Sequence, residues 1–255
     1  MMMRAGIAGI AGRMGTLLAE EALKAGMIVV GGTSRKPDPA SDIVRFADPA
    51  ALAAACDVLI DFTHASAVIG HAQAVVAGGC AWVLGTSGLS AADEAAAAVA
   101  AQKVPVVYAP NFSPGVNLAL ALAERMAAAL PADSYDAEIV EMHHRQKVDA
   151  PSGTAIGLGR AVARGRGVTL EDVMESGRDG HVGARKPGAI GFAALRGGQV
   201  VGEHTLIFAA GTEHIELTHR AYDRRAFANG AIRAALWVRG QKPGLYSMMD
   251  VLGMA

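Results

Sequence analysis

Up to Pro110, short apolar segments alternate with amphipathic segments along the chain. The apolar segments are rich in β-branched residues and end at glycine or polar positions, which is typical of strands. Strands are predicted at 4–8, 27–30, 58–60, 81–84 and 104–108, and helices at 14–25, 66–77 and 90–102. Because continuous apolar strands separated by helices form parallel sheets covered on both faces, this part is predicted to be a doubly wound α/β domain.

The pattern changes after Pro110, where longer strand-like segments follow one another with turn residues between them. Helices are predicted at 116–130, 152–164 and 225–239, and strands at 137–142, 190–196, 199–208 and 214–219. The last three strands are expected to pair successively as antiparallel neighbours, because short turns such as the glycines at 197–198 separate them. The final helix is expected to pack on the first domain. Residues 165–188 give no firm prediction, although Arg178 and Arg185 could approach a ligand or a neighbouring subunit.

The composition of the chain excludes several classes of protein. Hydrophobic residues make up 52% of the 255 residues and charged residues 18%, which excludes a mostly disordered chain. Lys and Arg total 23 against 24 Asp and Glu, so the chain lacks the basic footprint of a nucleic-acid-binding protein. No apolar run reaches the about 20 residues of a membrane span and no signal-peptide pattern is visible, so a cytoplasmic protein without nucleic-acid or membrane partners is expected. Cys56 and Cys80 match neither a disulfide framework nor a zinc pattern, and we interpret them as small buried residues.

A glycine-rich loop joins the first predicted strand to the first predicted helix. Its spacing, Gly9-x-x-Gly12-x-x-Gly15, is a variant of the dinucleotide-binding fingerprint. The first glycine allows the tight turn, the second lets the backbone approach a pyrophosphate, and the third lets helix and strand pack closely. The helix N-terminus adds N–H donors and a partial positive charge. Glycines also occur in ordinary strand–helix turns, but their place at the first junction favours a dinucleotide site.

The end of the second predicted strand selects between NAD(H) and NADP(H). A carboxylate there would bind the ribose 2′-hydroxyl of NAD(H), but the sequence has Arg35 and Lys36 and no acid before Asp38. These basic residues suit the 2′-phosphate of NADP(H), so NADPH is the favoured cofactor and NADH use stays open. The alternative is a solvated basic turn. Loops after three later strands are expected to face the same crevice, at 61–64, 85–88 and 109–113.

Residues that can transfer protons or bind anions are most concentrated between Glu141 and Ala155. Two histidines, an arginine and a lysine occur within positions 143–147, and a Ser-Gly-Thr helix start follows. Because neighbouring residues on a strand point to opposite faces, His143 and His144 can face one point only if a turn begins there. The histidine pair has no third ligand at a suitable spacing, so no metal site is predicted.

An anion-binding interpretation fits this segment better. Lys147 and His144 offer positive or hydrogen-bond-donating groups. The N–H groups of Gly153 and Thr154, with the Thr154 hydroxyl, form a second anion site at a helix start, which Ser152 or Thr154 could cap. Two anion sites suit a small dicarboxylate. The alternative is a solvated basic loop beside a capped helix.

Together these motifs resemble those of the 4-hydroxy-tetrahydrodipicolinate reductase (dihydrodipicolinate reductase) family of the diaminopimelate–lysine pathway. The resemblance covers nearly the whole chain, and its most specific segment is EMHHRQKVDAPSGTA at 141–155. The other segments that carry it are GIAGRMG at 9–15, DFT at 61–63, GTSG at 85–88, APNFS at 109–113, GVN at 115–117, GEHT at 202–205, THRA at 218–221 and RAFA at 225–228.

The resemblance implies an α/β fold with an N-terminal Rossmann-type parallel-sheet domain and a C-terminal mixed α/β domain that has a largely antiparallel sheet. The dinucleotide-binding domain would span 1–112 and be completed by 223–255. The substrate-binding and oligomerisation domain would span 113–222 and build a homotetramer. The implied reaction is the NAD(P)H-dependent reduction of 4-hydroxy-tetrahydrodipicolinate, a cyclic dicarboxylate, to tetrahydrodipicolinate.

The resemblance also implies residue roles. His143 would be the acid–base group and Lys147 the proton donor. The substrate carboxylates would be held by His144, Lys147, Gly153 and Thr154. The cofactor would contact Gly9, Ile10, Ala11, Gly12, Arg13, Met14, Arg35, Gly85, Thr86, Ser87, Ala109, Pro110, Asn111 and Phe112.

Two residues depart from the family pattern. Ser34 stands where members that use both cofactors have an acid, which weakens the NADH assignment. Pro114 replaces a small aliphatic residue before Gly-Val-Asn. Two other classes stay open as alternatives: a related two-domain NAD(P) oxidoreductase acting on an amino acid or a semialdehyde, and a regulator that senses a nucleotide and keeps only the fold.

Overall fold

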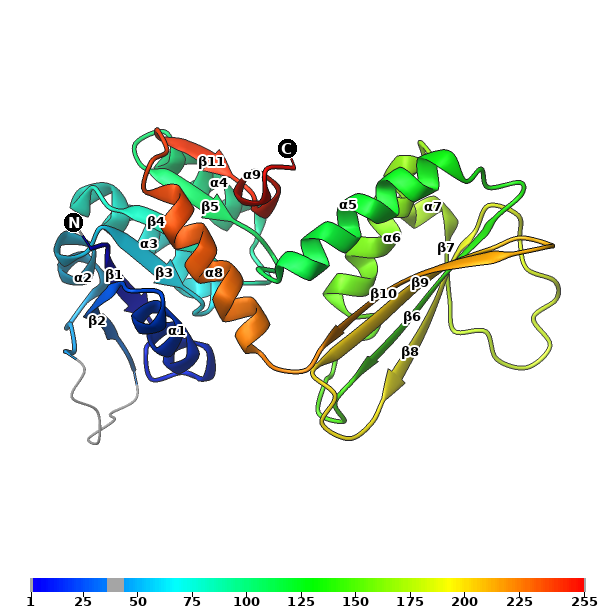
Figure 1. Ribbon diagram of the computed structural model, residues 1–255, viewed down its shortest axis with the longest axis horizontal. Coiled ribbons are helices and arrows are strands. Elements are labelled where there is room, and N and C mark those ends of the chain that lie inside the picture. Colours follow the sequence, from blue (N-terminus) through cyan, green and yellow to red (C-terminus); the bar gives the residue numbers. More distant parts are fainter. Residues whose placement is uncertain (1, 36–43, 255) are drawn as a thin grey trace. The chain divides into compact units, whose positions relative to one another are not determined.

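The computed structural model describes residues 2–35 and 44–254, which fold into two compact units (Figure 1). Unit 1 comprises the chain up to Pro114 together with the chain from Arg224 onward, and unit 2 runs from Gly115 to Asp223. Both divisions lie within two residues of the boundaries expected from the sequence. Among the described residues, no helix has the length and apolar character needed to cross a membrane.

Unit 1 contains a parallel sheet whose described strands follow the order β11-β5-β4-β3-β1-β2. The strands are β1 (Arg4–Ala8), β2 (Ile28–Thr33), β3 (Val58–Asp61), β4 (Ala81–Leu84), β5 (Pro105–Tyr108) and β11 (Gly244–Tyr246). Because β1 lies between β2 and β3, the chain leaves it first toward one edge of the sheet and later toward the other. Such a switch point opens a ligand-binding crevice at the carboxyl ends of the strands. The predicted doubly wound fold is confirmed.

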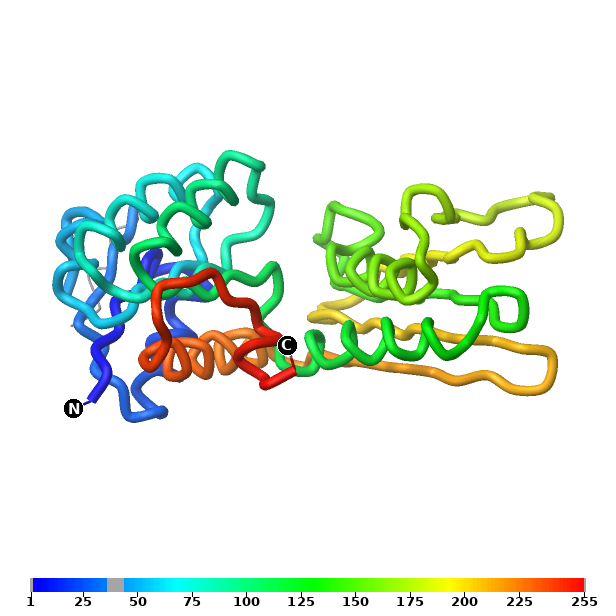
Figure 2. The backbone as a smooth tube through the Cα atoms, turned by 90° about the horizontal axis from the view of Figure 1, so that it is seen from above, coloured from blue at the N-terminus to red at the C-terminus, as the bar shows by residue number. Residues whose placement is uncertain are grey.

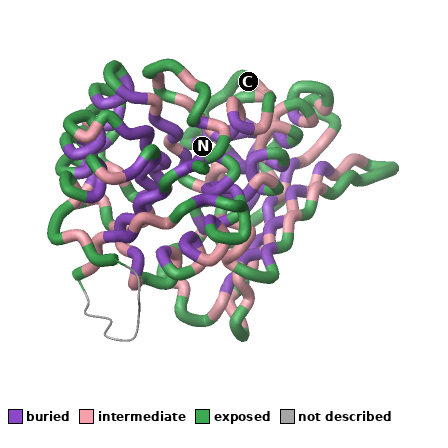
Figure 3. Tube along the Cα trace, turned by 60° about the vertical axis from the view of Figure 1, so that its left-hand side comes forward, coloured by how far each residue is buried: buried purple, intermediate pink, exposed green. Residues whose placement is uncertain are grey.

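Helices cover both faces of this sheet (Figure 1). On one face lie α1 (Arg13–Lys24), α8 (Arg225–Val238) and α9 (Met248–Leu252), and on the other α2 (Pro49–Ala55), α3 (Val68–Gly78), preceded by a 3-10 turn (Ala65–Ala67), and α4 (Ala91–Ala101). Successive side chains of a strand point to opposite faces of the sheet, so each face has its own core. Val58 and Ile60 of β3 belong to one core, and Leu59 belongs to the other. Figure 3 shows buried residues in the interior and exposed residues at many of the outer turns.

The last long helix packs on unit 1, as the sequence predicts. The inward side of α8 consists mainly of small residues. Gly230 lies so close to the loop after β5 that a Cβ atom there would overlap the carbonyl oxygen of Phe112. At the start of the helix, Arg225 pairs with Glu20 of α1 at 2.9 Å. Small side chains therefore let α8 lie directly on the backbone of unit 1.

Unit 2 contains a mixed sheet whose described strands follow the order β10-β9-β6-β8-β7. The strands are β6 (Asp136–His143), β7 (Met174–Ser176), β8 (Ile190–Arg196), β9 (Gly202–Ala209) and β10 (His214–Ala221). β9 pairs antiparallel with β6 and β10, whereas β8 pairs parallel with β6 and β7. The sheet is therefore antiparallel only on one side of β6.

The expectation that β8 and β9 pair as antiparallel neighbours is wrong, because β6 lies between them. β8 instead returns parallel to β6 after a long connection that contains α6 (Gly153–Gly165) and α7 (Leu170–Val173). A crossover of this length is what parallel strands require. The glycine turn after β8 therefore passes the end of β6 rather than closing a hairpin.

Two long helices cover one face of the unit 2 sheet. α5 (Pro114–Ala129) and α6 run side by side (Figure 2). Gly157 of α6 faces Leu120 of α5, where a Cβ atom would be 3.3 Å from Cδ2 of the leucine. The third core forms between these helices, α7 and the inward residues of β6, β8 and β9.

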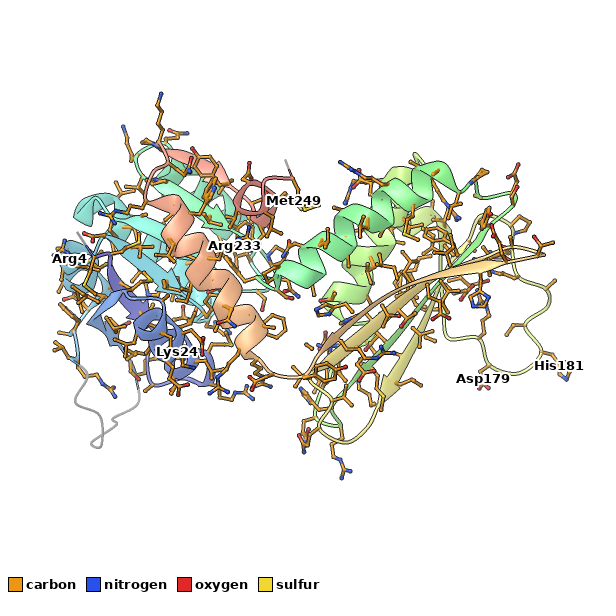
Figure 4. The ribbon with its side chains drawn as sticks, in the orientation of Figure 1. Arg4, Lys24, Asp179, His181, Arg233 and Met249 are labelled. Atoms are coloured by element: carbon orange, nitrogen blue, oxygen red, sulfur yellow. The ribbon has the colours of Figure 1, made fainter. Side chains whose placement is uncertain are left out.

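Ion pairs tie the segment between β7 and β8 to the sheet. Arg178 Nη1 donates to Glu138 Oε2 at 2.9 Å, and Arg185 Nε donates to Glu138 Oε1 at 2.7 Å. Both arginines are therefore held by an acid of their own unit. Figure 4 shows Asp179 and His181 on this segment, with their side chains directed away from the sheet.

Gly230→Ala is expected to destabilise unit 1. The added methyl group overlaps the Phe112 carbonyl and pushes α8 outward, and overpacking of this kind costs about 1–3 kcal/mol. The measurement is the midpoint of thermal unfolding. The control is Gly240→Ala, because a Cβ atom at Gly240 meets nothing within 4 Å. Equal midpoints for the two variants would contradict the packing of α8.

Candidate active site

Polar side chains from three strands meet at one end of the helix-covered face of the unit 2 sheet. The inward positions of β6 change from apolar to polar and end in Glu141 and His143. β8 ends at Arg196, in register with His143, and His204 of β9 lies opposite Glu141. Because β9 runs antiparallel to β6 and β8 runs parallel to it, the first residues of β9 and the last residues of β6 and β8 lie at the same end of the sheet. This is also where α6 begins.

Glu141 is the centre of this cluster. Its side chain is 1% exposed and accepts four hydrogen bonds, two on each oxygen. Arg196 donates two hydrogen bonds to it, from Nη1 to Oε2 and from Nη2 to Oε1, both at 2.8 Å. His143 Nδ1 is 2.6 Å from Oε2, and the Ser152 backbone N–H donates to Oε1 at 3.1 Å. Burial alone would raise the pKa of Glu141, but the hydrogen bonds from Arg196 and His143 outweigh it and hold the pKa below its usual value.

An ionised Glu141 decides the tautomer of His143. A carboxylate only accepts hydrogen bonds, so Nδ1 of His143 must carry the proton between them. Nε2 is then the nitrogen that gains and loses a proton. Burial lowers the pKa of His143, and Glu141 acts in the opposite direction. Gly202 leaves space beside Nε2, since a Cβ atom at Gly202 would lie 3.0 Å from it. His143 can therefore act as a general acid or base at Nε2.

His204 packs against His143 and joins it to α6. The two rings meet edge to face, with centroids 5.0 Å apart. His204 Nε2 is 2.9 Å from the Ser152 hydroxyl, whose oxygen also accepts the Ala155 N–H at 3.2 Å. Burial, together with the neighbouring His143, lowers the pKa of His204 to about 4. His204 is therefore neutral near pH 7.

Lys147 lies on the turn that follows β6. The strand ends at His143, so the turn needed to release the following residues from strand geometry is present. The Lys147 ammonium donates to Asp149 Oδ1 at 2.8 Å, and this contact lowers the pKa of Asp149. The Asp149 carbonyl accepts a hydrogen bond from Arg196 Nη2 at 2.7 Å. The lysine turn is thus connected to the Glu141 cluster.

The start of α6 supplies backbone donors beside this cluster. Ser152 is the N-cap residue, because its hydroxyl accepts the Ala155 N–H. Gly153 is exposed and has open space around its Cα atom. An anion can therefore approach the first turn of the helix, where the partial positive charge of the helix favours it.

The glycine loop of unit 1 has the backbone conformation that a dinucleotide site requires. Gly9 has a φ of +73°, in the left-handed region that favours glycine. A Cβ atom at Gly15 would overlap the Gly9 carbonyl oxygen, so glycine is needed for α1 to begin this close to β1. Gly12 is the N-cap residue of α1 and is exposed. The helix N-terminus is therefore open to a phosphate.

Buried Asp61, at the end of β3, holds the loops around the switch point. Its Oδ1 accepts the Thr63 N–H at 3.1 Å and the Thr63 hydroxyl at 2.6 Å. Its Oδ2 is 2.6 Å from Nδ1 of His71 on α3, and the Thr86 hydroxyl donates to Oδ1 at 3.4 Å. A Cβ atom at Gly9 would lie 3.1 Å from Thr63. The loops after β3 and β4 therefore meet at this carboxylate, and the loop after β1 lies against Thr63.

Phe62 connects the loops after β4 and β5 to the same edge. Its ring covers Gly85 and lies 5.3 Å from the ring of Phe112, between centroids. Arg35 is exposed just beyond β2, while Lys36 and Asp38 lie outside the described residues.

Metal sites and cysteine thiols are two further candidates for chemistry in the part of the chain that the structure describes. Within residues 2–35 and 44–254, no group of three or more His, Cys, Asp or Glu side chains is arranged to hold a metal ion. Cys56 and Cys80 are buried free thiols, as predicted.

Two family models divide the chain between them. The one described as dihydrodipicolinate reductase, N-terminus, matches residues 3–112, and the one described as dihydrodipicolinate reductase, C-terminus, matches residues 115–252. This chain belongs to the dihydrodipicolinate reductase family.

Members of the dihydrodipicolinate reductase family align with nearly the full chain. A 4-hydroxy-tetrahydrodipicolinate reductase from Granulibacter bethesdensis is 71% identical over 255 residues, with 98% of this chain and 97% of that protein covered. One from Gluconacetobacter diazotrophicus is 61% identical over 251 residues, with the same coverage. The structure of a dipicolinate-bound dihydrodipicolinate reductase from Paenisporosarcina sp. TG-14 has a TM-score of 0.78 and 26% identity, covering 98% of this chain and 99% of that one.

The structure brings together several of the residues that the family resemblance singles out. In unit 2, Glu141 and Arg196 connect His143, the Lys147 turn and the start of α6. His144 lies one residue beyond β6, and its Nδ1 is buried with no hydrogen-bond partner among the described residues. In unit 1, the residues of the predicted cofactor loops that meet around Asp61 and Phe62 are Gly9, Gly85, Thr86 and Phe112. Ser87, Pro110 and Arg35 are exposed.

Sequence reasoning gave no role to Arg196, His204 or His71. For His204 a signal was present, because an inward position of an otherwise apolar strand carries a polar residue there. For Arg196 the signal was hidden, because its partnership with Glu141 depends on the pairing of β8 with β6, which the sequence did not predict.

The lowered pKa of His204 predicts a loss of stability in mild acid. The unfolded chain takes up a proton near pH 6.5 and the folded chain only near pH 4, so stability falls as the pH drops through this window. Between about pH 7.5 and 5.0 the loss from this group amounts to about 2 kcal/mol. Urea unfolding at both pH values measures it.

The variant for this test is His204→Gln, which keeps a polar partner for Ser152 but does not titrate. Between these two pH values, the free energy of unfolding of the variant should fall by about 2 kcal/mol less than that of the parent protein. The control is His214→Gln, because His214 is exposed. If His204→Gln loses as much stability in acid as the parent does, His204 is not the titrating group.

Proposed function

We propose that this chain is a 4-hydroxy-tetrahydrodipicolinate reductase, which reduces its cyclic dicarboxylate substrate with NAD(P)H in diaminopimelate and L-lysine biosynthesis. The observation that carries the proposal is the Glu141–His143 pair, which lies beside the Lys147 turn and the start of α6 in a chain of this family. It combines a proton-transfer group, a cation and a helix N-terminus in one unit.

The glycine loop of unit 1 fits a dinucleotide. A Cβ atom at Gly15 would fill the contact between α1 and the loop, and Gly12 is exposed at the helix start, where a pyrophosphate binds in this class of fold. The cofactor would be held by the residues from Gly9 to Met14, by Arg35, and by the loops at 85–87 and 109–112. When bound, it supplies the hydride, and the protein contributes binding and orientation.

The two ends of the unit 2 site suit two carboxylates. We assign one carboxylate to the amides of Gly153 and Thr154 at the start of α6, where the open space beside Gly153 allows approach. We assign the other to Lys147 and His144. A substrate carboxylate at Lys147 would replace Asp149 as the partner of the ammonium group. Two such contacts orient a ring, which is worth several kcal/mol, on the order of what positioning contributes in other enzymes.

Lys147 and His143 would handle the proton. Hydride addition to the end of a conjugated C=C–C=N system places negative charge on the nitrogen and on the carbon next to the one that receives the hydride. The Lys147 ammonium stabilises this charge and donates a proton. His143 exchanges a proton at Nε2, because Glu141 occupies Nδ1. Ionised Glu141 compensates the positive charge that His143 gains when it is protonated.

Several finer features belong to the same proposal. NADPH is the preferred cofactor, because Arg35 is exposed at the end of β2 and the described part of that loop has no acid. NADH serves as the weaker alternative. The homotetramer that the family resemblance implies and the cytoplasmic location expected from the sequence complete the proposal.

Turnover tests the reaction and the role of Lys147 together. Oxidation of NADPH should depend on the freshly formed condensation product of pyruvate and aspartate semialdehyde. Lys147→Ala should lower kcat by about 10²–10⁴-fold, because it removes the proton donor, and leave NADPH binding nearly unchanged. Steady-state kinetics and fluorescence titration with NADPH measure the two effects.

The control for Lys147→Ala is Lys103→Ala, an exposed lysine of unit 1. Turnover of another amino acid or semialdehyde, with none of the condensation product, would refute the proposed function. Parallel loss of NADPH binding and turnover in Lys147→Ala would indicate a structural role instead.

Arg35→Ala tests the cofactor preference. Removing a charge-assisted hydrogen bond to the 2′-phosphate should raise KM for NADPH by about 10–100-fold, since such bonds contribute about 1.5–3 kcal/mol. KM for NADH should change little. Steady-state kinetics with both cofactors measure the ratio, and an equal rise in both KM values would argue against a 2′-phosphate contact.

A further inference from the structure

Arg196 contacts two parts of the unit 2 site that the chain brings from different places. Its guanidinium holds both oxygens of Glu141, the hydrogen-bond partner of His143, at 2.8 Å each. Its Nη2 also donates to the Asp149 carbonyl at 2.7 Å, and the side chain of that residue pairs with Lys147. One side chain thus reaches the partners of both proposed proton-transfer groups.

The hydrogen-bond count on Glu141 explains why an arginine is needed. The carboxylate has about four acceptor positions, and Arg196 fills two of them, one on each oxygen. The other two receive His143 Nδ1 and the Ser152 N–H, on different oxygens. A planar fork therefore fixes the plane of the carboxylate, and with it the direction in which His143 is held. A lysine at this position offers one point charge and no second branch.

The position of Arg196 is also fixed by the sheet. It is the last residue of β8 and lies in register with His143 on β6, so its backbone is held by the sheet. Its side chain is about one-fifth exposed, at 21%, whereas Glu141 is buried at 1%. Without Arg196 the buried carboxylate would lose its positive counter-charge and two of its hydrogen bonds.

We propose that Arg196 is a positioning residue of the reductase: it orients Glu141 so that His143 presents Nε2 to the substrate, and it holds the Asp149 carbonyl so that Lys147 stays beside His143. The inference rests on the proposed function, to which it adds a residue that touches neither substrate nor cofactor. It also makes Glu141 the link through which Arg196 acts on His143.

Other charged or titratable groups face His143 and must be kept in place during the test. They come from each element around it: Glu141 on β6, Arg196 on β8, His204 on β9, and Lys147 and Asp149 on the turn. His219 of β10 lies behind His204, in register with it. None of these residues is altered in the experiment except Arg196.

The first readout is the tautomer of His143, which requires no enzymatic activity. Nitrogen-15 NMR of histidine-labelled protein reports which ring nitrogen carries the proton, and His143→Gln identifies the His143 signals by their loss. In the parent protein we expect a single neutral tautomer with the proton on Nδ1. In Arg196→Ala we expect this preference to be lost, and guanidinium at a non-denaturing concentration should restore it by filling the same space.

The second readout is kinetic. Arg196→Ala should lower kcat by about 10²-fold, because proton transfer by His143 and Lys147 is no longer aligned, with KM for NADPH unchanged. Guanidinium should recover part of the lost kcat. Arg196→Lys should fall between the parent and Arg196→Ala in both readouts, and it serves as the test variant if Arg196→Ala does not fold. The control is Arg164→Lys, which alters an exposed arginine paired with Glu124 in the same unit.

The outcomes separate this inference from the proposed function. An unchanged His143 tautomer in the Arg196 variants, or a lower kcat with no change of tautomer and no rescue, would overturn the positioning role. A parent protein that cannot reduce the condensation product would refute the proposed function, while the tautomer result would still decide whether Arg196 orients His143. A changed tautomer, a lower kcat and guanidinium rescue together support the inference.

Discussion

The ion pair between Glu141 and Arg196 is the interaction on which the unit 2 site depends. A carboxylate that is 1% exposed would be too costly to keep ionised without a partner, and the two-pronged contact with Arg196 supplies one. The ionised carboxylate then receives His143 Nδ1 and the first amide of the α6 cap. The tautomer of a histidine, the position of a helix start and the path of the lysine turn all follow from one buried charge.

Unit 1 also has a buried carboxylate at the end of a strand, which holds loops in place. Asp61 is buried at the end of β3 and faces His71, while its other oxygen accepts hydrogen bonds from the Thr63 and Thr86 loops. A buried acid at the carboxyl end of a parallel strand can hold loops that have no regular structure of their own. In both units, polar residues at the ends of otherwise apolar strands make the edge of a packed core a rigid support for a candidate site.

Much of the fold was predictable because local patterns decide it. The strand at 81–84 has the predicted bounds, and the glycine spacing from Gly9 to Gly15 correctly placed the turn into α1. Short elements such as α2, β7 and β11 were missed, since three to seven residues give no clear period. The bounds of β8 were predicted correctly, but its neighbour in the sheet was not. Two consecutive strands with a glycine turn look like a hairpin in sequence, and only the insertion of β6 between them excludes it.

By itself, the sequence determined the two-part α/β architecture and the glycine loop before α1, and it singled out His143, Lys147, Gly153 and Thr154 as candidate site residues, because each of these features depends on neighbours within one segment. The tertiary structure alone decided how these groups are supported. Glu141 and Arg196 are 55 positions apart and Asp61 and Thr86 are 25 apart, and each pair meets only after strands have paired in a particular register. Hydrophobic periodicity states that a strand will pair but not with which strand, so contacts that depend on pairing became visible only in the folded chain.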